Sequence, residues 1–138
     1  EHELGDTDRA TQLLREGLAI DARQSTMALL LARLLVTQGN ADAALAVLSD
    51  HGVDGGEADG LRGGVLAQRG DHRNSLTAYE SALRHQPGNP LWWLGLGVAL
   101  ESDGQPQRAR QAYGRAQSLG LRRDDLAGYV DQRLRALE

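Results

Sequence analysis

Four glycines at nearly regular spacing constrain the fold of this chain more than any other feature. They lie 34, 31 and 34 residues apart, at Gly5, Gly39, Gly70 and Gly104. Each is followed five positions later by a small residue, namely Ala10, Ala44, Ser75 and Ala109. Each is followed nine positions later by a large one, namely Leu14, Leu48, Tyr79 and Tyr113. A fixed period of this length is typical of stacked helical hairpins, which present an extended surface rather than a catalytic pocket.

The composition fits a helical core made of leucine and alanine. Of the 138 residues 41% are hydrophobic, but only 4% are aromatic and none is phenylalanine. Leucine and alanine are strong helix formers. The net charge is -4 with both signs interspersed, so we expect neither a nucleic-acid partner nor a polybasic membrane contact. The absence of cysteine excludes disulfide and thiolate chemistry and is compatible with the cytoplasm and the periplasm alike.

The third repeat carries the most complete motif. Trp93, Leu96 and Gly97 have the spacing W-x-x-L-G, and Pro87 closes the preceding unit. The motif continues through Gly104, Ala109, Tyr113 and Ala116. In these positions the chain resembles the tetratricopeptide repeat (TPR) family. The resemblance implies an all-α fold, a right-handed superhelical solenoid of helix-turn-helix hairpins.

We expect a single TPR domain over residues 1–138. Its parts are a half repeat at 6–22, three repeats at 25–55, 56–89 and 90–121, and a capping helix at 123–137. The predicted helices are 6–21, 25–38, 41–50, 57–69, 72–85, 90–103, 106–118 and 123–137. The last helix has one apolar face, which is expected to cover the final hairpin. Because the chain starts within a repeat and without methionine, we interpret it as a fragment of a longer protein.

Three glycines fall inside the predicted helix 57–69, at Gly60, Gly63 and Gly64. Each costs roughly 1 kcal/mol of helix stability relative to alanine. One of them is the packing residue of the repeat. The other two indicate either a mobile helix or a groove floor that a partner approaches closely.

The TPR resemblance implies that the first helix of each hairpin lines a concave groove. Counting back from each periodic glycine, and adding Leu91, gives Leu29, Arg33, Val36, Gly60, Gly64, Ala67, Leu91, Leu94, Val98 and Glu101. This mostly apolar set predicts a protein or peptide partner that offers a helical or extended apolar segment. It disfavours the carboxylate clamp of chaperone-binding TPR domains, whose positions here are mostly leucine or glycine. The alternative is that these residues pack against other segments of the same protein.

Trp92 stands next to the motif residue Trp93. Adjacent residues of a helix point in different directions, so one of the two should be core and the other nearer the surface. Trp92 is therefore a candidate anchor for a partner. The alternative is a wedge between neighbouring hairpins.

Nothing in the sequence predicts catalysis or a cofactor. The four histidines, His2, His51, His72 and His85, show no metal-ligand spacing. An acidic cluster at Asp50, Asp54, Glu57 and Asp59 does not have the spacing of a calcium loop. We expect no metal, no cofactor, no catalytic residue and no enzymatic activity.

A narrower resemblance rests on the segment 89–101, on Gly120 and Leu121, and on the final helix. This arrangement is similar to the C-terminal TPR region of the MshN family of MSHA-type pilus biogenesis proteins. The resemblance implies the periplasmic part of an inner-membrane protein in type IV pilus or envelope assembly. Without it, a cytoplasmic location is expected.

We predict a protein–protein interaction module that binds its partner in the concave groove. The alternative is a structural scaffold that acts through self-association. A homo-oligomer would form through the uncapped N-terminal end, where Leu13, Leu14, Leu18 and Ile20 lack a covering helix.

Overall fold

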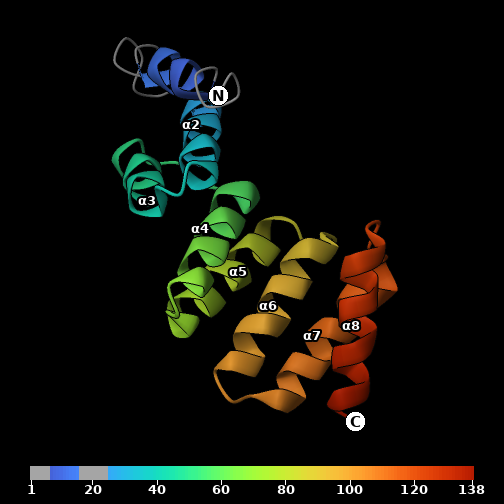
Figure 1. Cartoon of the computed structure of the whole chain (residues 1–138). Helices are drawn as coiled ribbons and strands as arrows, with labels where there is room; N and C mark the ends of the chain where they lie inside the picture. The colour runs from blue at the N-terminus through green and yellow to red at the C-terminus, as the bar shows by residue number, and fades with distance from the viewer. Residues whose placement is uncertain (1–6, 16–24) are drawn as a thin grey trace. The chain divides into compact units, whose positions relative to one another are not determined.

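The computed structural model describes residues 7–15 and 25–138, and these are helices joined by short loops. Residues 7–15 are helical. The helices that follow are α2 (Ser25–Thr37), α3 (Ala41–Asp50), α4 (Gly56–Gln68), α5 (His72–His85), α6 (Pro90–Ser102), α7 (Pro106–Leu119) and α8 (Asp124–Ala136) (Figure 1). Each of these seven agrees with its predicted bounds to within one residue at either end. The first predicted helix, 6–21, lies partly outside the described residues. The all-α prediction is confirmed.

The chain divides into two compact units, residues 1–54 and residues 55–138, which are described separately. In the N-terminal unit α2 and α3 form a hairpin. Its buried residues are Ala28, Leu31, Ala32, Leu35, Ala44, Val47, Leu48 and Val53. The Gln38 side-chain amide donates to the Asp8 carboxylate at 3.2 Å and to the Thr11 hydroxyl at 3.1 Å. These bonds join the helical residues 7–15 to the end of α2. The expected repeat boundaries and single domain stay a prediction.

In the C-terminal unit the helices α4 to α8 pack in succession, as two hairpins followed by α8 (Figure 1). The shared core consists of Tyr79, Leu83, Leu96, Leu100, Ala109, Ala112, Tyr113 and Val130. Val130 of α8 is fully buried. The last helix therefore covers the final hairpin, as its apolar face predicted.

The periodic glycines end the first helix of each hairpin. Gly39, Gly70 and Gly104 have φ values of 79°, 79° and 75°. This left-handed conformation is strained for residues with a Cβ atom, and glycine adopts it freely. The repeat of glycines in the sequence is thus a repeat of turns. Gly5 lies outside the described residues.

Aromatic rings of the C-terminal unit rest on glycines within the helices. A Cβ atom on Gly63 would lie 2.8 Å from the Tyr79 ring, and one on Gly97 would lie 2.7 Å from the Tyr113 ring. A Cβ atom on Gly95 would overlap with Tyr79, and one on Gly60 would overlap with Trp92. Gly63 thus has the packing role that the repeat predicts. Gly60 also lies under a ring, which neither a mobile helix nor a groove floor anticipates, whereas Gly64 meets only the Tyr79 hydroxyl.

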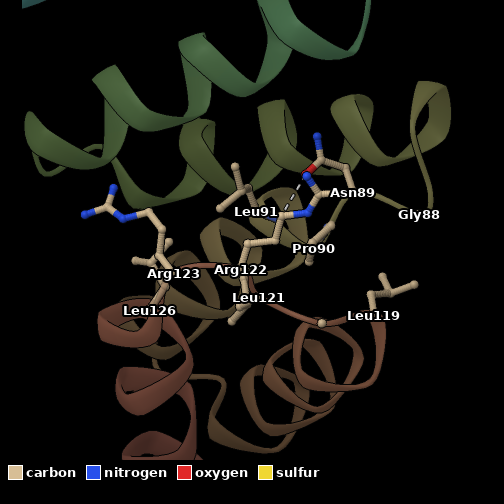
Figure 2. Close-up of a pocket in the computed structure, with 10 residues that line it drawn as sticks. Gly88, Asn89, Pro90, Leu91, Leu119, Leu121, Arg122, Arg123 and Leu126 are labelled. Atoms are coloured by element: carbon tan, nitrogen blue, oxygen red, sulfur yellow. Dashed lines mark hydrogen bonds between the residues drawn. The ribbon is translucent and has the colours of Figure 1, made fainter.

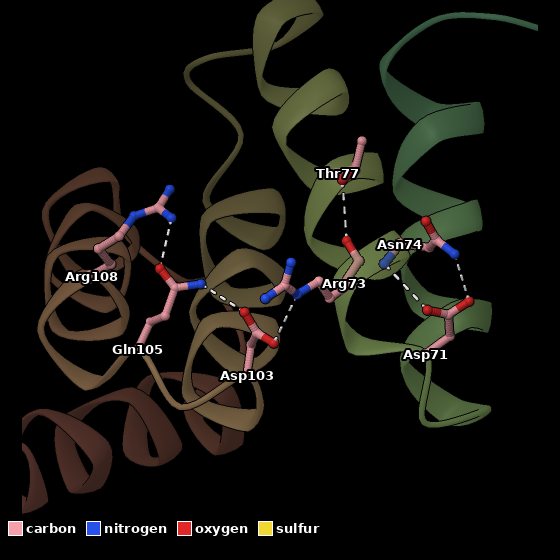
Figure 3. A network of polar contacts seen from close by, with 7 residues as sticks. All are labelled: Asp71, Arg73, Asn74, Thr77, Asp103, Gln105 and Arg108. Carbon is pink, nitrogen blue, oxygen red and sulfur yellow. Dashed lines mark hydrogen bonds and ion pairs between the residues drawn. The ribbon is translucent and has the colours of Figure 1, made fainter.

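Polar contacts join the two hairpins of this unit near the Gly70 and Gly104 turns (Figure 3). Asp71 accepts a hydrogen bond from the backbone N–H of Asn74 and so caps the start of α5. The Arg73 guanidinium lies 3.6 Å from the Asp103 carboxylate in the next hairpin. Gln105 donates to Asp103 at 2.7 Å, which holds that carboxylate in place. These exposed contacts fix the geometry of the turns more than they add to stability.

Candidate functional site

Two hollows lie between α6 and α8 in the C-terminal unit. The first, which we name the Leu–Arg hollow, has a volume of about 430 Å³ (Figure 2). It is lined by Gly88, Asn89, Pro90, Leu91, Leu119, Gly120, Leu121, Arg122, Arg123 and Leu126. The second has a volume of about 470 Å³ and is lined by Val98, Glu101, Ser102, Tyr129, Gln132 and Arg133. Since both hollows use residues of α6 and α8, we call them together the α6–α8 groove.

Local sequence builds the first hollow. Asn89 accepts a hydrogen bond from the Leu91 backbone N–H at 3.0 Å, and Pro90 occupies the first turn of α6. Both choices are favoured at a helix start. Gly120 has a φ of 90° and ends α7. The chain turns at Gly120, so that Leu119 and Leu121 line the same hollow as the first residues of α6.

The groove gathers the exposed apolar side chains of its unit. Within residues 55–138, all of them described, the exposed large apolar residues are Leu91 (47%), Leu119 (42%) and Tyr129 (39%). All three line the α6–α8 groove. Single exposed apolar residues are common on protein surfaces, whereas a cluster of them marks an interaction site.

Charged and aromatic groups close the second hollow. Glu101 accepts hydrogen bonds from the Tyr113 hydroxyl at 2.8 Å and from Arg133 Nε at 3.0 Å, and it also contacts Arg133 Nη2. The rings of Tyr113 and Tyr129 meet edge to face with centroids 6.2 Å apart. Partial burial acts to raise the pKa of Glu101, but the hydrogen bonds from Arg133 and Tyr113 outweigh it and lower that pKa. The Glu101–Arg133 pair is therefore charged at neutral pH.

The predicted groove residues of α6 separate into two roles. Leu91, Val98 and Glu101 line the groove, together with residues of α8. Leu94 and Val98 are both half-buried and pack against the core of the unit. Val98 therefore has both roles, whereas Leu94 lines neither hollow. The structure therefore brings together three of the four groove residues predicted on this helix.

The predicted residues of α4 lie away from both hollows. Gly60 is buried, and its surroundings are filled by the Trp92 ring. Gly64 and Ala67 are half-buried, and a Cβ atom on Gly64 would lie 3.4 Å from the Tyr79 hydroxyl. Close packing of aromatic rings thus occupies this part of the predicted surface.

The remaining predicted groove residues belong to the N-terminal unit. On α2, Leu29 and Val36 are half-buried and Arg33 is exposed. They lie one or two helical turns apart, so they follow one side of that helix. The α6–α8 groove is built without them.

Trp92 packs between the two hairpins of the C-terminal unit. Its ring lies 6.3 Å from the Tyr79 ring, between centroids, and covers Gly60. Its indole N–H donates to the Gln86 side chain at 2.6 Å. Trp93 is also half-buried; it donates to the Pro87 carbonyl, and Arg115 lies 5.4 Å from its ring centroid. The geometry of Trp92 matches the wedge, the alternative to an exposed anchor.

Sequence reasoning missed the α8 side of the groove. Leu126, Tyr129 and Arg133 face α6 across the hollows, but the apolar face of this helix was assigned to capping alone. Their spacing of three and four residues was the available signal, since it places them on one side of the helix.

One cluster of α4 and α5 contains the residue types of a catalytic triad. Ser81 donates to the Asp59 carboxylate at 2.6 Å, and His85 Nε2 lies 4.0 Å from the same carboxylate. A triad requires the histidine to contact the serine hydroxyl. Here Asp59 takes that place and also pairs with Arg62 at 2.9 Å, so the cluster is explained as an ion-pair and hydrogen-bond network.

The described part of the chain offers neither a metal site nor a membrane-spanning helix. Within residues 7–15 and 25–138, no group of three or more histidine or acidic residues is arranged to hold a metal ion. In the same ranges no helix has the length and apolar character needed to cross a membrane.

Comparisons with known proteins identify the repeat. Two sequence profiles, both described as tetratricopeptide repeat, match residues 1–54 and 61–125, together more than half of the chain. No curated protein matches it, and none of the matches bears on the narrower resemblance to the MshN region.

Solved structures of MamA share the fold. One is 17% identical with a TM-score of 0.80 and covers 99% of this chain and 89% of that one. A MamA RS-1 double mutant is 18% identical with a TM-score of 0.79, over 98% of this chain and 81% of that chain. MamA from Desulfovibrio magneticus RS-1, residue 41 to the end, is 17% identical with a TM-score of 0.78 over the same shares. The predicted helical repeat solenoid is confirmed.

Proposed function

This chain belongs to the tetratricopeptide repeat family, and we propose that its α6–α8 groove binds a helical or extended apolar segment of a partner protein. Repeats of this family are protein-interaction or scaffold modules, and the solenoid fold shared with MamA agrees with that role. Within residues 55–138 the groove is where the exposed large apolar side chains lie.

A single observation carries the proposal. All three exposed large apolar side chains of residues 55–138 lie at the two hollows between α6 and α8. Leu91 and Leu119 line the first hollow, and Tyr129 lines the second together with the half-buried Val98. Shallow apolar grooves between helices accept amphipathic helices or extended apolar segments. The groove was predicted on the α6 side, and α8 supplies its second wall.

The test is a selection of short random peptides on the chain, followed by affinity measurements on variants. Val98→Asp should lower the affinity of the selected peptides by at least about tenfold. The substitution removes an apolar contact with the peptide and adds a charge that must be desolvated on binding. Tyr129→Glu should act in the same way from the other wall. Ser118→Asp adds the same charge to α7, outside the groove, and should leave the affinity unchanged.

Circular dichroism separates binding from folding in this experiment. If Val98→Asp unfolds the chain, Tyr129→Glu decides, because Tyr129 is 39% exposed and tolerates substitution better. Folded variants that keep every peptide would overturn the groove as the binding site. A selection on the wild-type chain that yields no peptide would overturn it equally.

We further propose that the module acts in MSHA-like type IV pilus or envelope assembly. Its support is the resemblance of residues 89–101 and of the final helix to the MshN region, which also carries the periplasmic location. Photo-crosslinking from position 98 in the source cells would test it. Crosslinks to components of pilus assembly are expected, and crosslinks confined to unrelated cytoplasmic proteins would contradict it.

A second candidate function is a scaffold that acts through self-association. Leu13 in the helical residues 7–15 is 56% exposed, and Leu30 on α2 is 45% exposed. Leu18 and Ile20, which were expected to share this surface, lie outside the described residues. Sedimentation velocity should show a concentration-dependent oligomer that Leu13→Asp disrupts, whereas a strict monomer would remove this candidate.

A further inference from the structure

The Leu–Arg hollow combines two kinds of side chain. Its apolar walls come from the start of α6, the end of α7, the loop after it and the first turns of α8, at Leu91, Leu119, Leu121 and Leu126. The charged residues that line it, Arg122 and Arg123, are both arginines. Figure 2 shows the Arg122 side chain extending from the loop toward Asn89, next to Leu91 and Pro90. The hollow therefore offers apolar surface and positive charge side by side.

The two arginines differ in their existing contacts. Arg123 pairs with Asp125 at 2.9 Å. Arg122 is exposed and forms no ion pair or hydrogen bond with any residue that the structure describes. In the sequence Arg122 is followed by Arg123 and then by Asp124 and Asp125. A guanidinium without a partner beside apolar surface is suited to a carboxylate, which it binds through two parallel N–H donors.

The other end of the groove has no such group. Glu101 there is bonded to Arg133 and to the Tyr113 hydroxyl, so its charge is compensated. The charged groups that line the second hollow are thus paired, whereas the Leu–Arg hollow has one arginine, Arg122, without a partner among the described residues. A bound segment can match this difference in one direction only.

We propose that the Leu–Arg hollow recognises an apolar side chain next to a carboxylate on the bound segment, with Arg122 as the main donor. The inference rests on the proposed function and specifies the chemistry of the ligand. The apolar side chain packs among the leucines, and the carboxylate accepts from the Arg122 guanidinium. That carboxylate belongs to an aspartate or glutamate side chain of the bound segment.

Two features near the hollow bear on how much Arg122 and Arg123 contribute to peptide binding. Asp124 and Asp125 stand in the first turn of α8, outside the lining of the hollow, and reduce the local positive potential. The arginines also follow the C-terminal end of α7, where positive charge stabilises a helix. A purely stabilising role would change the unfolding free energy of arginine variants without changing which peptides bind.

The experiment uses the peptide selection on the full chain. Peptides enriched by the wild type should carry Asp or Glu beside a leucine-like residue. Replacing that acid by its amide should weaken binding about two- to fivefold at low salt, and less at high salt. Arg122→Gln should remove most of this difference and Arg123→Gln less of it. Arg110→Gln is the matched control, since it removes an exposed arginine of α7 outside the hollow.

The results that would overturn the recognition of a carboxylate differ from those that would overturn peptide binding by the groove. Peptides that depend on Val98 but show no preference for acids would leave the proposed function standing and overturn this inference. An acid preference that survives Arg122→Gln together with Arg123→Gln would also overturn it. Binding that requires a free rather than an amidated C-terminus, with no preference for Asp or Glu, would overturn it as well. If no peptide binds to the wild-type chain, the proposed function itself would be contradicted.

Discussion

The two hairpins of the C-terminal unit use tyrosine at the same position but differ in what lies beyond it. Tyr79 of α5 rests on Gly63 of its own hairpin and on Gly95 of the next helix, α6. Tyr113 of α7 rests on Gly97 of its own hairpin and meets Tyr129 of the next helix, α8. One ring is enclosed between two glycines, while the other faces a second ring.

This difference bears on the second hollow, which Tyr129 lines. Gly95 lets α6 approach the Tyr79 ring closely, and Trp92 fills the space above Gly60. No equivalent glycine receives Tyr113 on α8, where Tyr129 remains 39% exposed. Rings packed on glycines close the junction of α4, α5 and α6, whereas the contact between the Tyr113 and Tyr129 rings lies beside the open second hollow.

Removing the two tyrosines should have the largest effect on stability. Tyr79→Ala and Tyr113→Ala each delete a buried ring, 9% and 0% exposed, and should each lower the unfolding free energy by about 3–5 kcal/mol. Tyr129→Ala is the control for an exposed ring and should cost much less. Urea unfolding followed by circular dichroism measures all three. Equal costs for Tyr79 and Tyr129 would show that the enclosed and open junctions are not distinct.

Two neighbouring glycines of α4 offer a sharper contrast. Gly63→Ala places a methyl group 2.8 Å from the Tyr79 ring and should destabilise the chain by about 1–3 kcal/mol through overpacking. Gly64→Ala meets only the Tyr79 hydroxyl, at 3.4 Å, and should gain up to about 1 kcal/mol of helix propensity.

The two substitutions should change the unfolding free energy in opposite directions. Thermal unfolding of both variants should give melting temperatures on either side of the wild type. If both substitutions stabilise, α4 is simply a weak helix whose glycines have no packing role. That result would restore the mobile helix considered from the sequence.

The helices and turns could be predicted from the sequence because their signals are local. Asn89 and Pro90 mark the start of α6, and the turn glycines mark the ends of α4 and α6 through their backbone conformation. The large buried positions Tyr79 and Tyr113 follow from the same period. Each of these depends on residues within one repeat.

The site was only half predictable because it depends on contacts between repeats. The role of Trp92 is decided by Gly60 in the preceding hairpin, which gives its ring a place to pack. The α8 wall is decided by the contact of Tyr129 with Tyr113 and by the bond from Arg133 to Glu101. A count along one helix identifies Val98 and cannot identify the residue that faces it from another.

The smallest expected effect concerns the charged pair at the open junction. The pKa of Glu101 is lowered in the folded chain by Arg133 and Tyr113, from an ordinary value of 4.5. Its contribution to stability is therefore fully present above about pH 4.5 and is lost as the pH falls through the lowered pKa. Glu101→Gln should destabilise the chain at neutral pH, and the difference from wild type should shrink in acid. Because both side chains of the pair are about a quarter exposed, the loss should be smaller than that of the Gly63 variant. Urea unfolding at a series of pH values measures it, and Arg133→Gln should reproduce the same pH dependence. A difference between Glu101→Gln and wild type that stays constant from neutral pH into acid would mean that the carboxylate charge contributes nothing. The open junction would then be held by the contact of Tyr113 with Tyr129 and by the burial of Val130, without help from the ion pair.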